Sequence, residues 1–350
     1  MKTNIENRKP QSEMKELLEL ASSANTKKSY SSDIKHYQEA WQGFLPASRA
    51  MVGEYLAHYA KTLKVSTLQR RCSALRDWHL KHGFSDPTDS KSIRELMKGI
   101  RKKYNQPADQ AEPLTLSHLS QIIGYLDSVI VDSQKCLTDT METKFLSALR
   151  DKSMILMGFW RGFRADTLVE LQQELIKPKK INFMGTLVNG LEIYLPYSKG
   201  DRLVKGDRFP LPSLSKMPKL CPVSAYQEWI NASDYYLSIT ENDGSSKVVY
   251  GRFEKKGEGN GIALTRHKMR SGSLAHWLPR LCKKAGIENY SEFSSHSMRR
   301  GLATFMHEQH IPIENIMHYI GWRSVSSAMK YLDLKTDGVS QLLSLTDKRE

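Results

Sequence analysis

The chain has 350 residues, which is long enough for two domains that each bury a core of their own. Its 52 lysines and arginines exceed its 38 aspartates and glutamates, and the net charge of +14 suits a polyanionic partner. No stretch approaches the roughly 20 consecutive apolar residues of a membrane span, and the first residues lack the apolar segment of a signal peptide, so we expect a cytosolic protein that does not bind a membrane.

The positive charge is concentrated toward the N-terminus. Residues 1–104 contain 20 basic and 11 acidic side chains, a net charge of +9, whereas the remaining part of the chain carries only +5. This distribution favours an N-terminal region that contacts nucleic acid. The alternative is a basic surface that serves only solubility.

Helical patterns fill the chain up to residue 104. We expect helices over residues 14–21, 23–41, 47–63, 65–83 and 90–104. In the fourth of these, Ser66 is suited to cap the N-terminus. The apolar stripe of that helix is expected at Leu68, Cys72, Leu75 and Leu80. Polar side chains lie beside or opposite this stripe at Gln69, Arg70 and Arg71.

Residues 105–113, NQPADQAEP, have two prolines and no basic side chain, which indicates a linker between two domains. After it, the pattern predicts helices over 114–126 and 143–158, and strands over 181–186, 190–198 and 208–212. A hairpin loop joins the last two strands, and the region from Pro222 onward is expected to be mostly helical. The predicted fold is therefore mainly α, with a small antiparallel β-sheet in the C-terminal domain.

The sequence has no pattern typical of a metal or cofactor site. The four cysteines are far apart and form no CxxC pair, so we expect reduced thiols at Cys72, Cys136, Cys221 and Cys282. The histidines around Glu308 have HExH spacing, not the HExxH of a zinc site, and no GxxxxGK[ST] phosphate loop occurs. We therefore expect neither a metal nor a cofactor.

The segment RGFRADTLVEL, residues 161–171, places an arginine next to an apolar helix. Gly162 permits a tight turn that would hold Arg164 at the mouth of the core. An arginine beside buried surface needs a partner, which is either a carboxylate or an anionic ligand. Asp166 and Glu170 are the candidate carboxylates, so the two alternatives remain open.

Three further segments contain candidate functional residues. Lys199 lies in the hairpin loop, where it either reaches a substrate or is merely solvated, and Lys205 is its competitor. The stretch SSHSMRRGLATFMH, residues 294–307, is a generic basic patch, a satisfied polar pair at a helix start, or half of an anion-binding catalytic site. Tyr331 follows Trp322 by nine residues, and by itself it is equally well a half-buried core residue.

Taken in order, RGFR, the hairpin lysine, HSMRRG, GW and a tyrosine nine residues after the tryptophan resemble the tyrosine recombinase (phage integrase) family, in particular its Cre-like members. Trp322 stands where a histidine is commoner in the family. The segment VSTLQRRCSALRDWHLKHG, residues 65–83, is similar to a DNA-facing helix of the family's core-binding domain.

The resemblance implies a C-shaped DNA clamp of two domains. A SAM-like helical core-binding domain would occupy residues 10–104, followed by the linker over 105–113 and the catalytic domain over 114–350. An exchange helix at about 338–347 would dock into a neighbouring subunit, although its apolar stripe also allows it to pack on its own domain.

The resemblance also assigns roles in catalysis. Tyr331 would attack a phosphodiester and form a 3′-phosphotyrosyl link, with no ATP or metal. Arg164 and Arg299 would clamp the non-bridging oxygens of the transition state. His296 would accept the proton of the tyrosine on cleavage and return it on ligation.

Two other site residues are implied, and one position departs from the family pattern. Lys199 would protonate the departing 5′-oxygen, and Trp322 can only donate its indole N–H. The family often has an acidic residue where this chain has Thr167. Support for the first arginine would then come from Asp166 or Glu170.

We therefore expect a site-specific recombinase that acts as a homotetramer on double-stranded DNA with inverted-repeat sites, is a monomer when free, and comes from a bacterial mobile element. The residues expected to contact DNA in the N-terminal domain are Lys28, Gln69, Arg70 and Arg94. The alternatives are a type IB topoisomerase-like enzyme and an architectural DNA-binding protein without catalysis.

Overall fold

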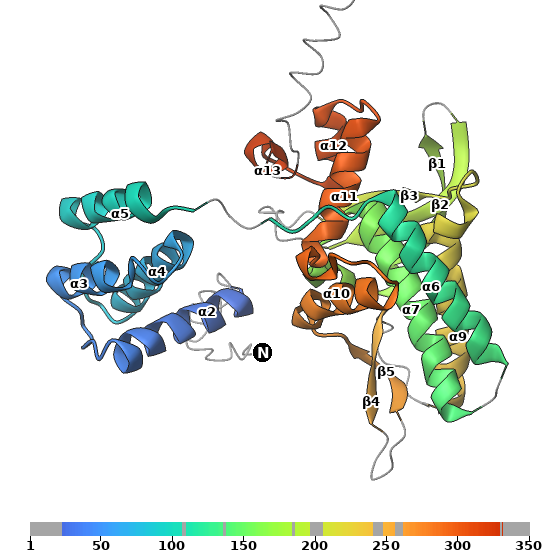
Figure 1. Cartoon of the computed structure of the whole chain (residues 1–350), viewed down its shortest axis with the longest axis horizontal. Coiled ribbons are helices and arrows are strands. Elements are labelled where there is room, and N and C mark those ends of the chain that lie inside the picture. Colours follow the sequence, from blue (N-terminus) through green and yellow to red (C-terminus); the bar gives the residue numbers. More distant parts are fainter. Residues whose placement is uncertain are drawn as a thin grey trace, which may run out of the picture. The chain divides into compact units, whose positions relative to one another are not determined.

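The computed structural model describes residues 23–106, 110–135, 138–183, 186–196, 206–240, 248–255, 262–329 and 331. The chain divides into two compact units, Met1–Asp109 and Gln110–Glu350. Each described element of the first unit is a helix, and the second unit combines helices with two small antiparallel sheets (Figure 1). The prediction of a mainly α chain with a small antiparallel sheet is confirmed.

The described part of the first unit contains five helical segments. They are α2 (Ala24–Lys35), its π-helical continuation η1 (His36–Ala40), α3 (Arg49–Tyr59), α4 (Val65–Lys81) and α5 (Lys91–Tyr104). Serine side chains cap α2, α3 and α5 by accepting hydrogen bonds from backbone N–H groups two or three residues into the helix. The core is aromatic and aliphatic, with fully buried side chains at Tyr37, Val52, Tyr55, Leu56 and Leu68.

Helix α4 differs from its prediction in two ways. It begins at Val65 with Lys64 at the N-cap position, so Ser66 lies inside the helix and does not cap it. Leu80 is 54% exposed, whereas Arg71 is buried. The buried face runs through residues 68, 71, 75 and 79, about one helical turn apart, because Arg71 is satisfied by hydrogen bonds within the unit and can therefore enter the core.

The second unit is organised around one long apolar helix. This helix, α7 (Asp139–Arg161), packs against α6 (Leu116–Gln134), α9 (Pro222–Thr240) and α11 (Ser295–Glu308) (Figure 1). Its C-terminal half is buried on all sides. The remaining helices are α8 (Ala165–Glu170), α10 (Leu274–Lys284), α12 (Ile313–Ile320), α13 (Val325–Met329) and the short 3₁₀ turns η2 (Gln173–Leu175), η3 (Pro218–Leu220), η4 (Ser271–Ser273) and η5 (Tyr290–Glu292).

The predicted strands form a three-stranded antiparallel sheet in the order β1 (Ile176–Phe183), β2 (Thr186–Leu195), β3 (Asp207–Pro212). Ile176 pairs with Ile193, and Leu191 pairs with Leu211. The first two strands were predicted too far along the chain. Gly190 is not the start of a strand but an interior position of β2, where a Cβ atom would collide with the backbone of β3.

A second sheet was missed. The prediction of mostly helical structure beyond Pro222 is wrong for β4 (Gly251–Lys255) and β5 (Ile262–Lys268), which pair antiparallel. Both strands carry several charged residues, and only Leu264 of β5 is well buried, so neither has a clear alternation of apolar and polar residues.

Several predictions lie outside the described residues, namely the helix over 14–21, most of the hairpin loop with Lys199 and Lys205, Cys136, and the tail helix over 338–347. The three cysteines of the described part, Cys72, Cys221 and Cys282, are free thiols. Within the described ranges, no helix is both long enough and apolar enough to cross a membrane.

Helix α11 approaches the start of the second unit very closely at Gly301. The backbone N–H of Leu114 donates to the carbonyl of Ser297, one turn earlier in α11, at 3.0 Å. A Cβ atom at Gly301 would overlap the carbonyl oxygen of Leu114 and lie 2.9 Å from the ring of Phe159. The glycine therefore allows the first residues of the unit to lie directly on the helix.

We expect Gly301→Ala to lower the free energy of unfolding by about 1–3 kcal/mol, because the backbone of residue 114 must move. The matched control is Gly124→Ala in α6, where a Cβ atom meets nothing within 4 Å. That control should raise the free energy of unfolding by about 0.5–1 kcal/mol, since alanine is the better helix former. Denaturant unfolding measures both, and equal effects of the two substitutions would contradict the close packing at Gly301.

Candidate active site

The structure brings four of the predicted site residues together from segments far apart in the sequence. Arg164 follows α7, Arg299 lies in α11, Trp322 follows α12 and Tyr331 follows α13. The guanidinium carbon of Arg299 is 5.1 Å from the centre of the Trp322 ring, and the rings of Trp322 and Tyr331 are 5.0 Å apart with their planes 32° apart. His296 is one turn before Arg299 on α11, and the charges of both arginines act on it.

The loop that carries Arg164 depends on Gly162. This residue ends α7 in the left-handed conformation, with φ at +59°, and a Cβ atom there would lie 3.2 Å from Ile320 and 3.3 Å from Leu302. The tight turn expected from the sequence is therefore present. It leads after one residue to Arg164, which occupies the N-cap position of α8 and is half-buried.

The carboxylate partners expected for Arg164 are not found where the sequence suggested. Glu170 forms an ion pair with Lys268 at 3.4 Å, because β5 places that lysine beside the end of α8. Neither Asp166 nor any other residue in the described ranges forms a hydrogen bond or ion pair with the side chain of Arg164. The guanidinium group thus remains available to a ligand.

Arg299 is buried, with only 3% of its surface exposed, and its donors are incompletely used. One nitrogen, Nη1, donates to the carbonyl of Gly162 at 2.5 Å, whereas Nε and Nη2 have no partner in the described part of the chain. Burial, followed by the charge of Arg164, lowers the pKa of Arg299 to about 9, although Tyr331 partly opposes this. A buried cation with unused donors is costly, and an anion placed between Arg164 and Arg299 would relieve that cost.

Arg300, the next residue, has a different environment. It is also buried, but its guanidinium group donates to the side chain of Gln110, at the start of the second unit. Successive residues of a helix point about 100° apart, so the two arginines face different neighbours. This contact gives Arg300 a structural role in the unit.

His296 is the second residue of α11, two positions after the N-cap Ser294. Its side chain is accessible to solvent. Removal of part of its hydration by the surrounding protein, then the charges of Arg164 and Arg299, lower its pKa below the usual value of 6.5. At neutral pH the imidazole is therefore uncharged and able to accept a proton.

A turn after α12 positions Trp322. Gly321 has a φ of +76°, and the backbone N–H of Trp322 returns to the carbonyl of Met317 at 2.8 Å, which is the Schellman arrangement. The indole is buried, yet its Nε1 has no acceptor among the described residues. Tyr331 is half-buried against this ring, and its backbone N–H donates to Ala328 at 2.9 Å.

In the first unit, the candidate DNA contacts fall into two groups. Lys28 and Gln69 are exposed. Arg70 forms two hydrogen bonds, of 2.8 and 2.9 Å, with the buried carboxylate of Asp33, and Arg94 pairs with Asp89 at 2.6 Å. The charges of these two arginines are therefore partly neutralised by neighbouring carboxylates.

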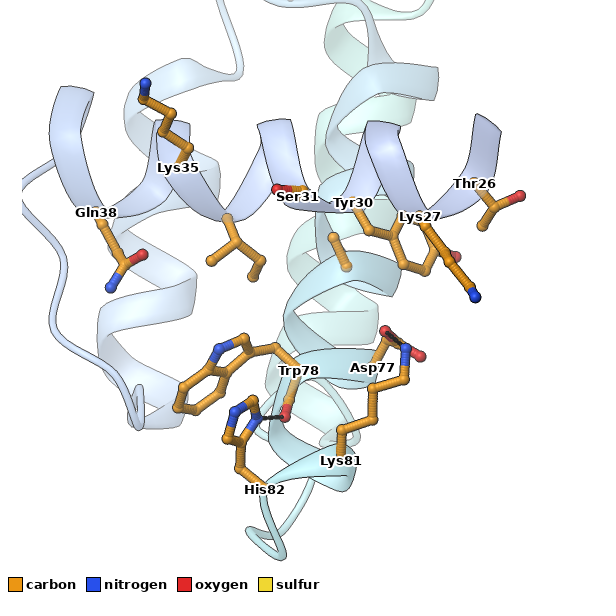
Figure 2. Close-up of a pocket in the computed structure, with 12 residues that line it drawn as sticks. Thr26, Lys27, Tyr30, Ser31, Lys35, Gln38, Asp77, Trp78, Lys81 and His82 are labelled. Carbon is orange, nitrogen blue, oxygen red and sulfur yellow. Dashed lines mark hydrogen bonds and ion pairs between the residues drawn. The ribbon is translucent and has the colours of Figure 1, made fainter. Parts of the chain in front are cut away.

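A groove between α2 and α4 is a feature that the sequence did not reveal. Figure 2 shows Trp78 on its floor, with Lys27 and Lys35 projecting from α2 and Lys81 from α4. The indole of Trp78 stacks on His82 at 4.1 Å, with an angle of 20° between the planes. In the sequence, this stacking was indicated only by the spacing of four residues between Trp78 and His82, which places both on one face of a helix. None of the four candidate DNA contacts lines this groove.

Comparisons with known proteins show which family this chain resembles. The profile of the phage integrase family matches residues 131–337, and that of the phage integrase N-terminal SAM-like domain matches residues 15–80. The integrase/recombinase xerD homolog of Selenomonas ruminantium is 26% identical over 326 residues, covering 91% of this chain and 84% of the relative. The recombinase cre of Escherichia phage P1 is 24% identical over 309 residues, covering 86% and 81% respectively.

Among solved structures, the XerH site-specific recombinase on its palindromic difH substrate, in a post-cleavage complex, superposes with a TM-score of 0.56. It shares 14% identity with this chain, over 92% of this chain and 80% of XerH. A lambda integrase dimer bound to a COC′ core site superposes with a TM-score of 0.53 and 15% identity, over 92% and 75% of the two chains. At these identities the structures show a shared fold.

We expect the imidazole of His296 to titrate below 6.5, and Arg164→Ala to move its midpoint upward because a nearby positive charge is removed. NMR titration of the ring protons measures both. Arg150→Met, a control substitution near the middle of α7, should leave the midpoint of His296 unchanged. An unaltered midpoint in Arg164→Ala would place the two side chains too far apart to interact.

The lowered pKa of His296 also makes the stability of the folded unit depend on pH. Below pH 6.5 the unfolded chain protonates this histidine more readily than the folded chain does, so the folded unit should lose stability as the pH falls through that range. Thermal denaturation at several pH values, compared with His296→Gln, isolates this contribution.

Proposed function

The chain belongs to the phage integrase family, and from this we propose that it is a site-specific tyrosine recombinase, which cleaves and rejoins DNA through a covalent tyrosine–DNA intermediate. One observation carries the proposal. Arg299 is buried beside Trp322 and Tyr331 with two unused donors, and Arg164 and His296 are near enough to act on the same charge. Such a site suits a phosphate.

In the proposed cleavage step, the phenol oxygen of Tyr331 attacks the scissile phosphorus. A phenol has an ordinary pKa of about 10, so it reacts poorly at neutral pH unless a base accepts its proton. His296 is that base, because partial burial, and then the charges of the neighbouring arginines, lower its pKa and keep it uncharged at neutral pH. The new P–O bond is a 3′-phosphotyrosyl link, and the bond to the 5′-oxygen breaks.

The two arginines stabilise the transition state of this step. Charge accumulates on the two non-bridging oxygens of the five-coordinate phosphorus, and guanidinium forks donate to them in a fixed geometry. Arg299 contributes its free Nε and Nη2, and Arg164 contributes from the adjacent loop. The indole N–H of Trp322, which has no acceptor among the described residues, is a further donor for the same charge.

Lys199 is proposed to give a proton to the departing 5′-oxygen, which leaves as a hydroxyl. Ligation runs the same path in reverse, since a 5′-hydroxyl attacks the phosphotyrosyl group and Tyr331 recovers its proton from His296. The energy of the broken phosphodiester is retained in the tyrosyl bond. Exchange of strands between two sites therefore needs neither ATP nor a metal.

DNA binding and assembly are also proposals. XerH and lambda integrase are each known bound to DNA sites, and the net charge of +9 over residues 1–104 supports a DNA contact by the first unit of this chain. We propose a clamp in which the two units bind opposite faces of the duplex, and four copies meet on paired inverted repeats in a bacterial cytosol. The tail near residues 338–347 would be exchanged between copies.

We expect Tyr331→Phe to bind DNA normally but to form no covalent adduct, because the attacking oxygen is missing. A cognate duplex is first selected from a randomised pool by binding, and duplexes nicked at successive positions then trap any adduct, since the short 5′-hydroxyl fragment diffuses away. Tyr290→Phe, in a partly buried turn of the same unit, is the matched control. An adduct in Tyr331→Phe would refute the assignment, and wild-type protein that binds without any adduct would favour an architectural protein.

Binding of the selected duplex should weaken steeply with salt, because phosphate contacts release counterions. Lys28→Ala should reduce the slope of log affinity against log salt concentration by about one. Lys28→Arg keeps the charge and should keep the slope. Fluorescence anisotropy at several salt concentrations measures this, and an unchanged slope in Lys28→Ala would remove this lysine from the DNA-binding surface.

A further inference from the structure

A third buried arginine, Arg161, lies next to the site but has no place in the chemistry described above. It is the last residue of α7, immediately before the Gly162 turn, and only 1% of its surface is exposed. A side chain buried to this degree cannot touch DNA directly. Its position between the elements that carry the site residues nevertheless links it to them.

The guanidinium group of Arg161 joins three elements through backbone carbonyls. Nη2 donates to Tyr319, near the end of α12, at 2.5 Å, and Nη1 donates to Pro210 of β3 at 3.3 Å. The hydroxyl of Tyr319 donates in return to the carbonyl of Trp160 at 2.9 Å. The ends of α7 and α12 are thus connected by two hydrogen bonds that run in opposite directions.

No carboxylate neutralises Arg161 within the described ranges. Its guanidinium carbon instead lies 4.1 Å from the ring centre of Tyr319, 4.9 Å from that of Phe209 and 5.7 Å from that of Phe163. Among the described residues, the negative faces of these rings and the carbonyls of Tyr319 and Pro210 compensate its charge. Burial accordingly lowers the pKa of this arginine.

The contact with Tyr319 completes the turn that holds Trp322. At the end of α12, the carbonyls of Met317 and His318 accept hydrogen bonds from Trp322 and Gly321. The next carbonyl, that of Tyr319, is the one that Arg161 binds. Without the side chain of Arg161, the carbonyl of Tyr319 would lose its hydrogen bond to the end of α7.

We propose that Arg161 is a positioning residue for recombination. Its buried guanidinium group holds the end of α12, and therefore Trp322, in register with the loop that carries Arg164. The inference rests on the proposed function, in which Tyr331 and Arg164 act on one phosphate. A displacement of about 1 Å between reacting groups is sufficient to slow a reaction on the order of 10²-fold.

The test compares Arg161→Met with Arg150→Met. Arg150 is also a buried arginine of α7, with its guanidinium carbon 4.8 Å from the ring of Phe253 and a hydrogen bond to the carbonyl of Gly251 at 3.2 Å. It also pairs with the adjacent Asp151 at 3.0 Å, and these contacts lead to β4 and along α7 but not to the site. Methionine keeps the length of the side chain and removes the charge and donors. Melting temperature, affinity for the selected duplex and the single-turnover rate of adduct formation on its nicked form are measured for both.

We expect both variants to bind DNA with unchanged affinity, whereas only Arg161→Met forms the adduct more slowly, on the order of 10²-fold. Arg161→Lys should recover part of the rate, because an ammonium group replaces the charge but cannot reach both carbonyls with a fixed fork. Equal adduct rates in Arg161→Met and Arg150→Met would overturn the proposal. If Arg161→Met does not fold, the lysine variants at the two positions decide by the same comparison.

A second measurement is independent of DNA chemistry. Hydrogen exchange at the amides of Gly321 and Trp322 should be faster in Arg161→Met than in Arg150→Met, since the turn loses its anchor. Unchanged exchange would overturn the positioning role. Wild-type protein that forms no adduct on any nicked duplex would instead contradict the proposed function, while the exchange experiment would still test the role of Arg161.

Discussion

Burial of unneutralised positive charge is the constraint on which the second unit depends. Arg161 and Arg299 are both almost completely buried, and neither has a carboxylate partner in the described part of the chain. Both bind carbonyl groups near the Gly162 turn instead. A buried cation that is compensated only by dipoles and aromatic faces leaves a positive electrostatic potential around it. The unpaired donors of Arg299 can therefore bind an anion. The long apolar helix α7 supplies the rigid support that this arrangement requires.

In the first unit, by contrast, two arginines are paired with a buried carboxylate. Asp33 is buried and binds Arg70 with two hydrogen bonds, and it also lies 3.6 Å from Arg71. Arg71 in turn donates to Tyr55. The carboxylate of Asp33 partly neutralises these two arginines. Their ion pairs therefore contribute to the packing of α2 on α4 more than to the electrostatic potential outside the unit. Arg70 and Arg71 thus serve the fold through a carboxylate, whereas Arg299, which has none, keeps donors unpaired and available for chemistry.

Local patterns predicted much of the fold. The helices over 47–63, 65–83 and 90–104 correspond to α3, α4 and α5, because periodic apolar residues, and for α3 and α5 a capping serine, are properties of a few neighbouring residues. The predictions were wrong where contacts between residues far apart in the sequence determine the structure. Leu80 was assigned to the core, but Arg71 takes the buried face because Asp33 and Tyr55 satisfy it. The strands β4 and β5 were missed because each is stabilised by the other and not by its own pattern.

The sequence by itself determined which residue types occur and in what order: an arginine after a glycine turn, a histidine one helical turn before a second arginine, and a tryptophan nine residues before a tyrosine. These spacings were sufficient to suggest the family and the reaction. Only the tertiary structure decided which charges are paired. Glu170 belongs to Lys268, Arg161 binds the end of α12, and Arg299 reaches a carbonyl 137 positions earlier in the chain. Such pairings depend on how whole helices pack, and no local pattern in the sequence carries that information.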